Sequence, residues 1–227
     1  MTRPWTTLEC VATPRGELCL RRRGESDFLI ALDGRVIMTS AAHRSESLLA
    51  EVAFAELGPR RRPHVLVSGL GMGYSLRAAL DLLPRSARVD VAELEPAVVA
   101  WCRGPLAALT DDAQGDRRVR VRSEDVAQTL ARAGKGRAPR YDAILLDLYE
   151  GPGGDADPVF GSAGIATLRD ALAEDGVLAV WSERPDPRFE KRLRGAGFRS
   201  RHARSHGGLR HTVTVARRGS FPAAWTC

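Results

Sequence analysis

The stretch VLVSGLGMGYSLRAAL, from Val65 to Leu80, decides the fold class. An apolar strand leads directly into three alternating glycines, Gly69, Gly71 and Gly73, and a helical pattern of apolar residues follows. Glycine permits a sharp backbone turn and lets a ligand approach the main chain without a Cβ in the way. A strand, a glycine turn and a helix in this order are typical of ligand sites at the carboxyl end of a parallel sheet.

From His64 onward, short apolar segments alternate with helical ones. This alternation predicts an α/β fold with a Rossmann-like, doubly wound and mostly parallel sheet and helices on both faces. The expected strands are 65–68, 88–93, 119–122, 143–148 and 176–182, and the expected helices are 74–83, 96–103, 124–133, 162–172 and 187–196. Segments 198–204 and 210–216 are expected to close the sheet as a C-terminal antiparallel hairpin. This outline is typical of class I methyltransferase-like folds.

The front of the chain has a different rhythm. Segments 17–22, 28–32 and 35–39 alternate between apolar and polar residues, and Asp33-Gly34 is a strong signal for a two-residue hairpin turn. We therefore expect a small N-terminal β-unit over residues 1–44. A helix over 45–57 then opens the Rossmann-like domain, which extends to residue 227.

Composition limits the function. The chain has 227 residues, a formal net charge of +6 and no apolar run of the roughly 20 residues that a membrane span requires. Its first residues lack the apolar core of a signal peptide, so we expect a cytoplasmic protein without a membrane partner. The positive charge is almost entirely arginine, without interleaved aromatic residues, which argues against nucleic acid as the partner. The cysteines are far apart, lack zinc spacing and are expected to be reduced thiols, so no metal is expected: Cys10, Cys19, Cys102 and Cys227.

Acidic residues follow the next two strands at positions that suit a nucleoside. Glu93 ends the second strand, about 20 residues after the glycine turn, where a carboxylate can accept hydrogen bonds from ribose hydroxyls. Asp125 follows the third strand and either accepts from the adenine amine or caps the next helix. The spacing alone does not separate a nicotinamide dinucleotide from S-adenosylmethionine. The third glycine of GxGxxG is missing after Gly73, which disfavours the dinucleotide.

With these residues placed, the sequence resembles the spermidine synthase family of polyamine aminopropyltransferases and their methyltransferase-like relatives. The resemblance covers most of the chain, including LDGRVIMTS, AAHRSES, the glycine turn, VAELEPAVV, SEDV and YDAILLDLYEGP. It implies a short N-terminal β-domain before a Rossmann-like domain, and a dimer or a tetramer, of which we expect a homodimer. It also implies that Glu93 binds ribose, that Asp125 binds the adenine amine, and that 147–150 form the floor of the reaction centre.

The departures from the family pattern concern charge. Aminopropyltransferases use decarboxylated S-adenosylmethionine, and an aspartate in their glycine motif usually pairs with its amine; here that residue is Met72. The catalytic aspartate of the family aligns with Glu150, and Ser45 and Glu46 stand where the family has a tyrosine and a polyamine-contacting residue. An uncharged loop suits the carboxylate of intact S-adenosylmethionine better than an unpaired amine.

Transfer from either sulfonium is an in-line displacement, so the protein must align the reactants and remove a proton from an amine nucleophile. Asp147 and Glu150 follow the fourth strand of the sheet and are the candidate catalytic acids, with Tyr149 shaping the pocket. Asp147 is expected mainly to fix the cofactor or the acceptor, so it is also a cofactor-binding candidate, and Glu150 is the candidate base. Glu150 is also a candidate anchor for the acceptor, together with His43 and Glu46 ahead of the predicted helix 45–57. Met72 and the three glycines are the expected cofactor-binding turn.

Several functions are compatible with these residues. The leading hypothesis is a spermidine synthase-like transferase that uses S-adenosylmethionine to methylate a small amine or a related nucleophile. The alternatives are a true aminopropyltransferase that uses decarboxylated S-adenosylmethionine, and a non-catalytic subunit that binds a nucleoside. An RNA methyltransferase is disfavoured by the absence of an Asn/Asp-Pro-Pro-Tyr segment after the fourth strand. A nicotinamide-dependent dehydrogenase is the last option.

Overall fold

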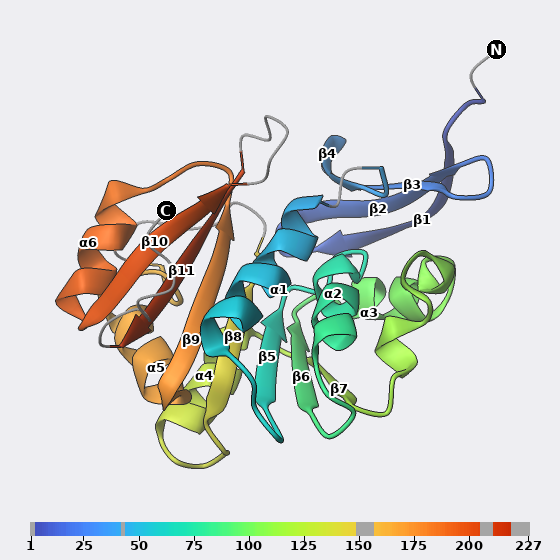
Figure 1. Cartoon of the computed structure of the whole chain (residues 1–227). Coiled ribbons are helices and arrows are strands. Elements are labelled where there is room, and N and C mark those ends of the chain that lie inside the picture. Colours follow the sequence, from blue (N-terminus) through green and yellow to red (C-terminus); the bar gives the residue numbers. More distant parts are fainter. Residues whose placement is uncertain (1–2, 42–43, 149–156, 205–210, 219–227) are drawn as a thin grey trace.

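The computed structural model describes residues 3–41, 44–148, 157–204 and 211–218. Within these ranges the chain forms two sheets (Figure 1). The first is a four-stranded antiparallel sheet in the order β1-β2-β3-β4, and the second has seven strands in the order β10-β11-β9-β8-β5-β6-β7. The α/β fold class expected from the sequence is confirmed.

The N-terminal sheet is a meander of four short strands, β1 (Thr6–Thr13), β2 (Gly16–Arg23), β3 (Asp27–Leu32) and β4 (Arg35–Thr39). Asp33 and Gly34 both have positive φ, 47° and 77°, as a two-residue turn between twisted strands requires. The sequence did not predict β1. Most of this strand is exposed on both faces, so it lacks the alternation of apolar and polar residues that identifies a half-buried strand.

The expectation that all four cysteines are reduced is wrong for two of them. Cys10 on β1 and Cys19 on β2 are directly opposite each other in the antiparallel ladder and form a disulfide. Their separation of nine residues does not predict a disulfide by itself, because the pairing depends on the register of the β1–β2 hairpin. Among the described residues, Cys102 is a free, buried thiol.

The larger sheet has the predicted parallel core and the predicted antiparallel end. Its parallel strands are β5 (His64–Ser68), β6 (Arg88–Glu93), β7 (Val119–Ser123), β8 (Tyr141–Leu146) and β9 (Leu172–Ser182). The hairpin of β10 (Phe198–Arg204) and β11 (Thr212–Arg218) then pairs antiparallel with β9. The start of β9 was predicted four residues late because the polar segment Glu174-Asp175 interrupts its apolar pattern.

Helices cover both faces of the larger sheet (Figure 1). They are α1 (Arg44–Leu57), α2 (Tyr74–Leu82), α3 (Pro96–Arg103), α4 (Val126–Gly134), α5 (Ser162–Ala171) and α6 (Pro187–Gly195). Successive side chains of β5 point to opposite faces of the sheet, so they pack in two different hydrophobic cores. Val65 and Val67 belong to the core that includes α1, α2 and α3, whereas Leu66 belongs to the core that includes α4, α5 and α6. No helix within the described ranges is long and apolar enough to cross a membrane.

Candidate active site

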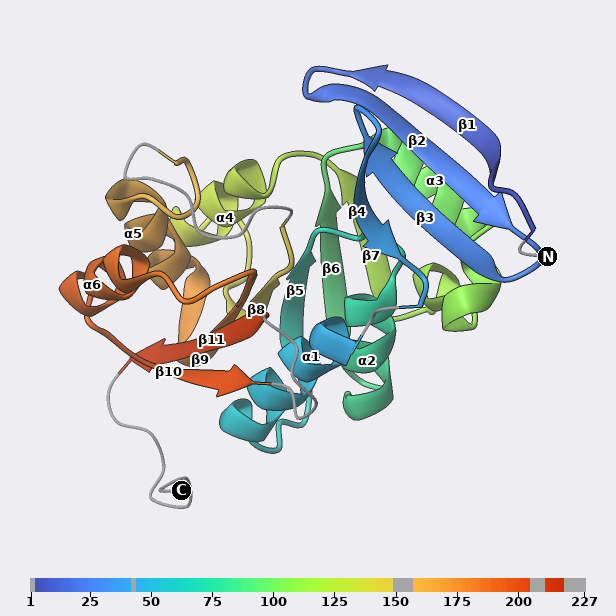
Figure 2. The ribbon, with the colours of Figure 1, turned by 90° about the horizontal axis from the view of Figure 1, so that it is seen from above.

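A cavity of about 1070 Å³ lies between the N-terminal sheet and the carboxyl ends of the parallel strands. Its lining includes Leu18, Ile30 and Met38 from the N-terminal sheet, and residues that follow β5, β6, β7 and β8. Figure 2 shows the N-terminal sheet extending over α3 and the part of the larger sheet that contains β6 and β7. The cavity therefore has walls from both sheets, at the edge where open parallel sheets bind ligands.

The glycine turn between β5 and α2 has the backbone that only glycine adopts easily. Gly69, Gly71 and Gly73 have φ values of 83°, 51° and 88°. A Cβ on Gly69 would lie 2.0 Å from the carbonyl oxygen of Asp147, and one on Gly71 would lie 2.8 Å from the terminal methyl of Met38. Gly69 and Gly71 line the cavity, whereas Gly73 faces Thr110 and is not among the lining residues.

Met72 is placed differently from the expectation. Its side chain is fully buried in the apolar core and does not line the cavity. Its backbone N–H donates to Sδ of Met38, at 3.2 Å. The turn therefore directs this side chain away from the cavity, so Met72 by itself does not decide which charge a ligand must have there.

Glu93 holds the glycine turn against the end of β6. One carboxylate oxygen accepts from the N–H of Leu70 at 2.7 Å, and the other accepts from the N–H of Glu95 at 2.9 Å. Burial raises the pKa of this carboxyl, although the backbone N–H groups act in the opposite direction. Glu93 lines the cavity at the strand end where a ribose was predicted, and ribose binding stays a prediction.

Asp125 caps a helix and also lies at the cavity. It is the N-cap of α4, because one carboxylate oxygen accepts from the N–H of Ala127 at 2.8 Å. Asp125 also lines the cavity, together with its neighbour Glu124. The helix cap fixes the Asp125 carboxylate at the edge of the site, and its contact with adenine stays a prediction.

Asp147 has the most perturbed carboxyl group of the cavity. Its backbone N–H donates to the carbonyl of Ser68, and its side chain accepts a short hydrogen bond of 2.5 Å from Ser75 Oγ. Burial, and secondly the negative charge of Glu46, raise the pKa of Asp147 to about 7, against the opposing effect of the Ser75 hydrogen bond. A carboxyl that titrates near neutral pH suits general acid–base work.

Glu46 reaches the cavity from the first turn of α1. Ser45 Oγ donates to the Glu46 carboxylate at 2.7 Å, and both residues are buried. Nδ1 of His211 lies 3.3 Å from the same hydroxyl, and the His211 ring packs on Trp181 with 4.9 Å between centroids. A hydrogen-bonded chain from His211, which immediately precedes β11, thus holds the Glu46 side chain within the cavity lining.

The structure brings together part of the predicted site. Gly69, Gly71, Glu93, Asp125 and Asp147 line the cavity, and so does Glu46 from the predicted acceptor side. Three predicted residues lie outside the described ranges, namely His43, Tyr149 and Glu150.

Sequence reasoning missed other lining residues that bear charge. These include Glu95, Glu124, Asp157, Glu183 and His211. The position of Glu95 two residues after Glu93 was a signal for the first of them. The acids at the end of β9 and ahead of α5 gave no signal, because only the folded sheet brings them to the same edge.

The cavity is acidic although the protein is basic. Eight carboxylates are among its lining residues: Glu46, Glu93, Glu95, Glu124, Asp125, Asp147, Asp157 and Glu183. Arg15 and His211 are the basic side chains in this lining. The chain as a whole carries a formal net charge of +6, so the concentration of acids at this cavity is specific to the site. Glu124 pairs with Arg132 and Arg122, and Glu183 pairs with Arg35. The remaining acids of the lining attract cationic ligands.

A doubly wound, mostly parallel sheet with a glycine turn after its first strand, an acid at the end of the second strand and a C-terminal antiparallel hairpin is the outline of a class I methyltransferase-like fold. The family model for the spermine/spermidine synthase domain matches residues 43–191. The chain therefore belongs to the spermine/spermidine synthase family, which is a family of transferases.

Solved structures agree with this fold. A crystal structure of spermidine synthase in complex with the transition-state analogue AdoDATO is 21% identical, with a TM-score of 0.70, over 94% of this chain and 72% of that one. Spermidine synthase from Thermotoga maritima is 18% identical, also with a TM-score of 0.70, over 95% of this chain and 74% of that one. No curated protein sequence matches the chain.

Proposed function

We propose that the protein is an aminopropyltransferase that moves the aminopropyl group of decarboxylated S-adenosylmethionine to a small amine. The observation that carries the proposal is the acidic lining of the cavity, with eight carboxylates. Decarboxylated S-adenosylmethionine carries a sulfonium and an ammonium but no carboxylate, and amine acceptors are cations as well. Both therefore match the charge of the cavity. The family membership supports the same reaction.

The expectation of methyl transfer from intact S-adenosylmethionine is not supported. It was based on Met72 as an uncharged neighbour of the donor's tail, but the Met72 side chain lies in the core. The acids that face the cavity, including Glu46 and Asp147, are instead available to an ammonium group. The additional carboxylate of intact S-adenosylmethionine would have to enter an already anionic site.

Each part of the proposed chemistry has a candidate group. Glu93 and Asp125 bind the nucleoside, and the N–H groups and open backbone of the glycine turn accommodate the rest of the donor. The acceptor nitrogen attacks the carbon next to the sulfonium, the carbon–sulfur bond breaks, and 5′-methylthioadenosine leaves. The nitrogen loses a proton in this step. Asp147 is the proposed proton acceptor, because its pKa of about 7 lets it take up a proton near neutral pH.

Two buried polar atoms at the cavity support the presence of a polar ligand. Ser68 Oγ and Trp181 Nε1 are buried without a hydrogen-bond partner among the described residues. Both residues line the cavity. Buried polar groups are almost always paired, so we assign these two atoms to contacts with a bound substrate.

The test compares the two donors in parallel. The full chain is incubated with decarboxylated or with intact S-adenosylmethionine, each with a panel of diamines and polyamines, and the nucleoside product is identified by mass spectrometry. The proposal requires amine-dependent 5′-methylthioadenosine from the decarboxylated donor. Formation of S-adenosylhomocysteine from the intact donor alone would establish methyl transfer instead, and binding without turnover would establish a non-catalytic subunit.

Variants then test the roles of the acids. Asp147→Asn is expected to lower kcat by at least about 100-fold, as loss of a general base does. Glu46→Gln is expected to raise the KM for the acceptor more than it lowers kcat. Glu174→Gln is the matched control, because it removes an exposed carboxylate from β9 that does not line the cavity. The proposal also includes a small-molecule acceptor and a homodimer. Light scattering tests the homodimer.

A further inference from the structure

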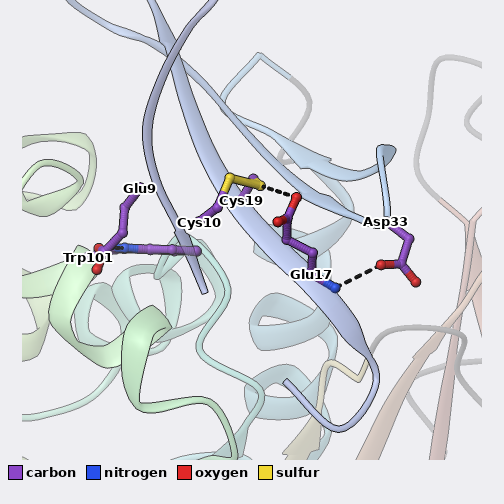
Figure 3. Close-up of a disulfide and its surroundings, with 6 residues drawn as sticks. All are labelled: Glu9, Cys10, Glu17, Cys19, Asp33 and Trp101. Carbon is purple, nitrogen blue, oxygen red and sulfur yellow. Dashed lines mark hydrogen bonds between the residues drawn. A yellow bond between two sulfur atoms is a disulfide. The ribbon is translucent and has the colours of Figure 1, made fainter. Parts of the chain in front are cut away.

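The disulfide between Cys10 and Cys19 closes a short loop that forms part of the cavity wall (Figure 3). Thr13, Arg15 and Leu18 lie within this loop, and all three line the cavity. The disulfide itself is on the other face of the sheet. Leu18 and Leu20 on β2 are buried, and Cys19 between them points to the opposite side.

The two sulfur-bearing residues are accessible to solvent. Cys10 is exposed and Cys19 is partly buried, so a reagent can reach the bond without opening the core. Cys102 differs, because it is buried, and burial together with the charge of Glu93 raises the pKa of its thiol to about 12. Thiol reagents that act on the folded chain therefore distinguish the two kinds of cysteine.

Few contacts other than the disulfide hold β1 in place. Most of this strand is exposed and contributes little apolar burial, so its local stability is low. Besides its ladder with β2, β1 has a hydrogen bond from Thr13 Oγ1 to the Gly16 carbonyl, and Val11 packs against the main core. The side chain of Glu9 also accepts a 2.6 Å hydrogen bond from Trp101 Nε1 on α3 (Figure 3). Opening the disulfide would leave these ties in place, so it would loosen the hairpin without unfolding the sheet.

The loop closed by the disulfide is also hydrogen-bonded to the turn between β3 and β4, and β4 forms another part of the cavity wall. The N–H of Glu17 donates to the Asp33 carboxylate at 2.7 Å, and the N–H of Asp33 donates to the Glu17 carbonyl at 2.9 Å (Figure 3). Asp33 precedes β4, whose residues Val36 and Ile37 line the cavity. A change in the order of the β1–β2 hairpin thus reaches two segments of the same wall.

We propose that Cys10–Cys19 is a thiol–disulfide exchange site that controls the wall of the substrate cavity, with dithiol reductants as its reaction partners. The thiolate of a dithiol attacks the exposed Cys10 sulfur, the bond to Cys19 breaks, and Cys19 leaves as a thiolate that takes up a proton. The second thiol of the reductant then displaces Cys10, which is also protonated. Two electrons and two protons pass to the protein, and the reductant becomes a disulfide; a disulfide of the same class reverses the exchange.

Glu17 moderates this exchange through its charge. One of its carboxylate oxygens lies 3.5 Å from the Cys19 sulfur. A carboxylate at this position repels an incoming thiolate and disfavours a thiolate on Cys19. It also offers an acceptor to the Cys19 thiol once the bond is reduced. The oxidised form is thereby protected from adventitious thiols, while the reduced form gains a hydrogen bond.

The first experiment does not depend on the reaction that the enzyme catalyses. The full chain is treated with dithiothreitol under native conditions, and the reduced cysteines are alkylated and mapped by mass spectrometry. We expect labelling of Cys10 and Cys19, no labelling of Cys102 and an unchanged far-UV circular dichroism spectrum. Hydrogen exchange of 11–18 should then rise at least tenfold on reduction. Exchange at this segment that is unchanged by reduction, or reduction that occurs only with global unfolding, overturns the proposal.

The second experiment concerns control of substrate binding, and this part rests on the proposed aminopropyl transfer. Reduction should change the KM for the acceptor amine at least threefold, and oxidised dithiothreitol should restore the original value. The Cys10→Ser/Cys19→Ser variant should have the KM of the reduced protein and ignore dithiothreitol. If the enzyme is active and its KM is the same in the oxidised and the reduced protein, redox control of the cavity is refuted. An inactive chain refutes the proposed function only, and hydrogen exchange still decides the redox site.

Glu17→Gln supplies a rate measurement. It should accelerate reduction by dithiothreitol by up to about sevenfold, which is the effect of a unit charge at this separation in water. Glu25→Gln is the matched control, because Glu25 is exposed in the β2–β3 turn at the other end of β2. Equal rates for both variants would contradict the electrostatic role of Glu17.

Discussion

The perturbed carboxyl of Asp147 makes the stability of the protein depend on pH in a defined direction. Its pKa is about 7 in the folded chain, against an ordinary value of 3.8. Below pH 4 both folded and unfolded chains bind the proton, so this group has no effect. Between pH 4 and 7 the unfolded chain loses the proton first, so the free energy of unfolding falls. Above pH 7 this group lowers the free energy of unfolding by about 4 kcal/mol, because the pKa of the folded chain is about three units above that of the unfolded chain.

Asp147→Asn removes this cost, since asparagine is uncharged and still accepts the hydrogen bond from Ser75 Oγ. We expect the variant and the wild type to be equally stable at pH 4, and the variant to be more stable by up to about 4 kcal/mol at pH 8. For a chain of this size that is a rise in melting temperature of roughly 10 °C. Urea unfolding and calorimetry between pH 4 and 8 measure the difference, with Glu174→Gln as the control.

The reasoning fails if the difference between Asp147→Asn and wild type is the same at pH 4 and pH 8. Glu46→Gln provides an internal check, because the charge of Glu46 is one cause of the raised pKa. In that background the effect of Asp147→Asn at pH 8 should be smaller. Binding of a cationic donor should also expel the proton from Asp147 near pH 7. Calorimetry in buffers of different ionisation enthalpy would detect its release.

Four further variants test the glycine turn, the buried ion pairs and the disulfide. Gly69→Ala should abolish folding or donor binding, because the new Cβ would lie 2.0 Å from a carbonyl oxygen. Gly34 also has positive φ, but the space around it is open, so Gly34→Ala should lower the free energy of unfolding by only about 1 kcal/mol. Thermal unfolding followed by circular dichroism measures both. Glu56→Gln should destabilise by about 3–5 kcal/mol in urea unfolding, because this buried carboxylate pairs with two arginines of the C-terminal hairpin; a loss below 1 kcal/mol would contradict that. Cys10→Ser/Cys19→Ser should lower the free energy of unfolding by about 2–3 kcal/mol relative to the oxidised wild type, measured in urea without reductant. The variant and the wild type should be equally stable when the wild type is reduced.

The sequence was most informative where a residue type is required by the backbone. The glycines of the turn after β5 and the two-residue turn at Asp33-Gly34 were recognised because their positive φ values restrict the choice of residue. Glu93 was located because parallel strands bring their carboxyl ends to one edge, and its distance from the glycine turn places it there. These features depend on local geometry and on a regular topology.

The rest depends on contacts that no local pattern encodes. The disulfide follows from the register of β1 and β2, and β1 itself gave no signal because it is exposed. The direction of Met72 is set by how the turn packs on Met38, which lies in another sheet. The chain of contacts from His211 to Glu46 joins the residue before β11 to the first turn of α1, and the two are more than 160 positions apart.

The contact between Met38 and the glycine turn has a consequence for the integrity of the site. A thioether from the small front sheet accepts the only N–H that Met72 has, and its methyl fills the space above Gly71 where a side chain would be. The glycine turn between β5 and α2 is therefore completed by a residue that the larger sheet does not supply. A chain trimmed to its parallel sheet would leave that amide unsatisfied, and conversion of this sulfur to a sulfoxide would insert an oxygen between the two layers. The N-terminal sheet thus completes the glycine turn as well as forming a wall of the cavity.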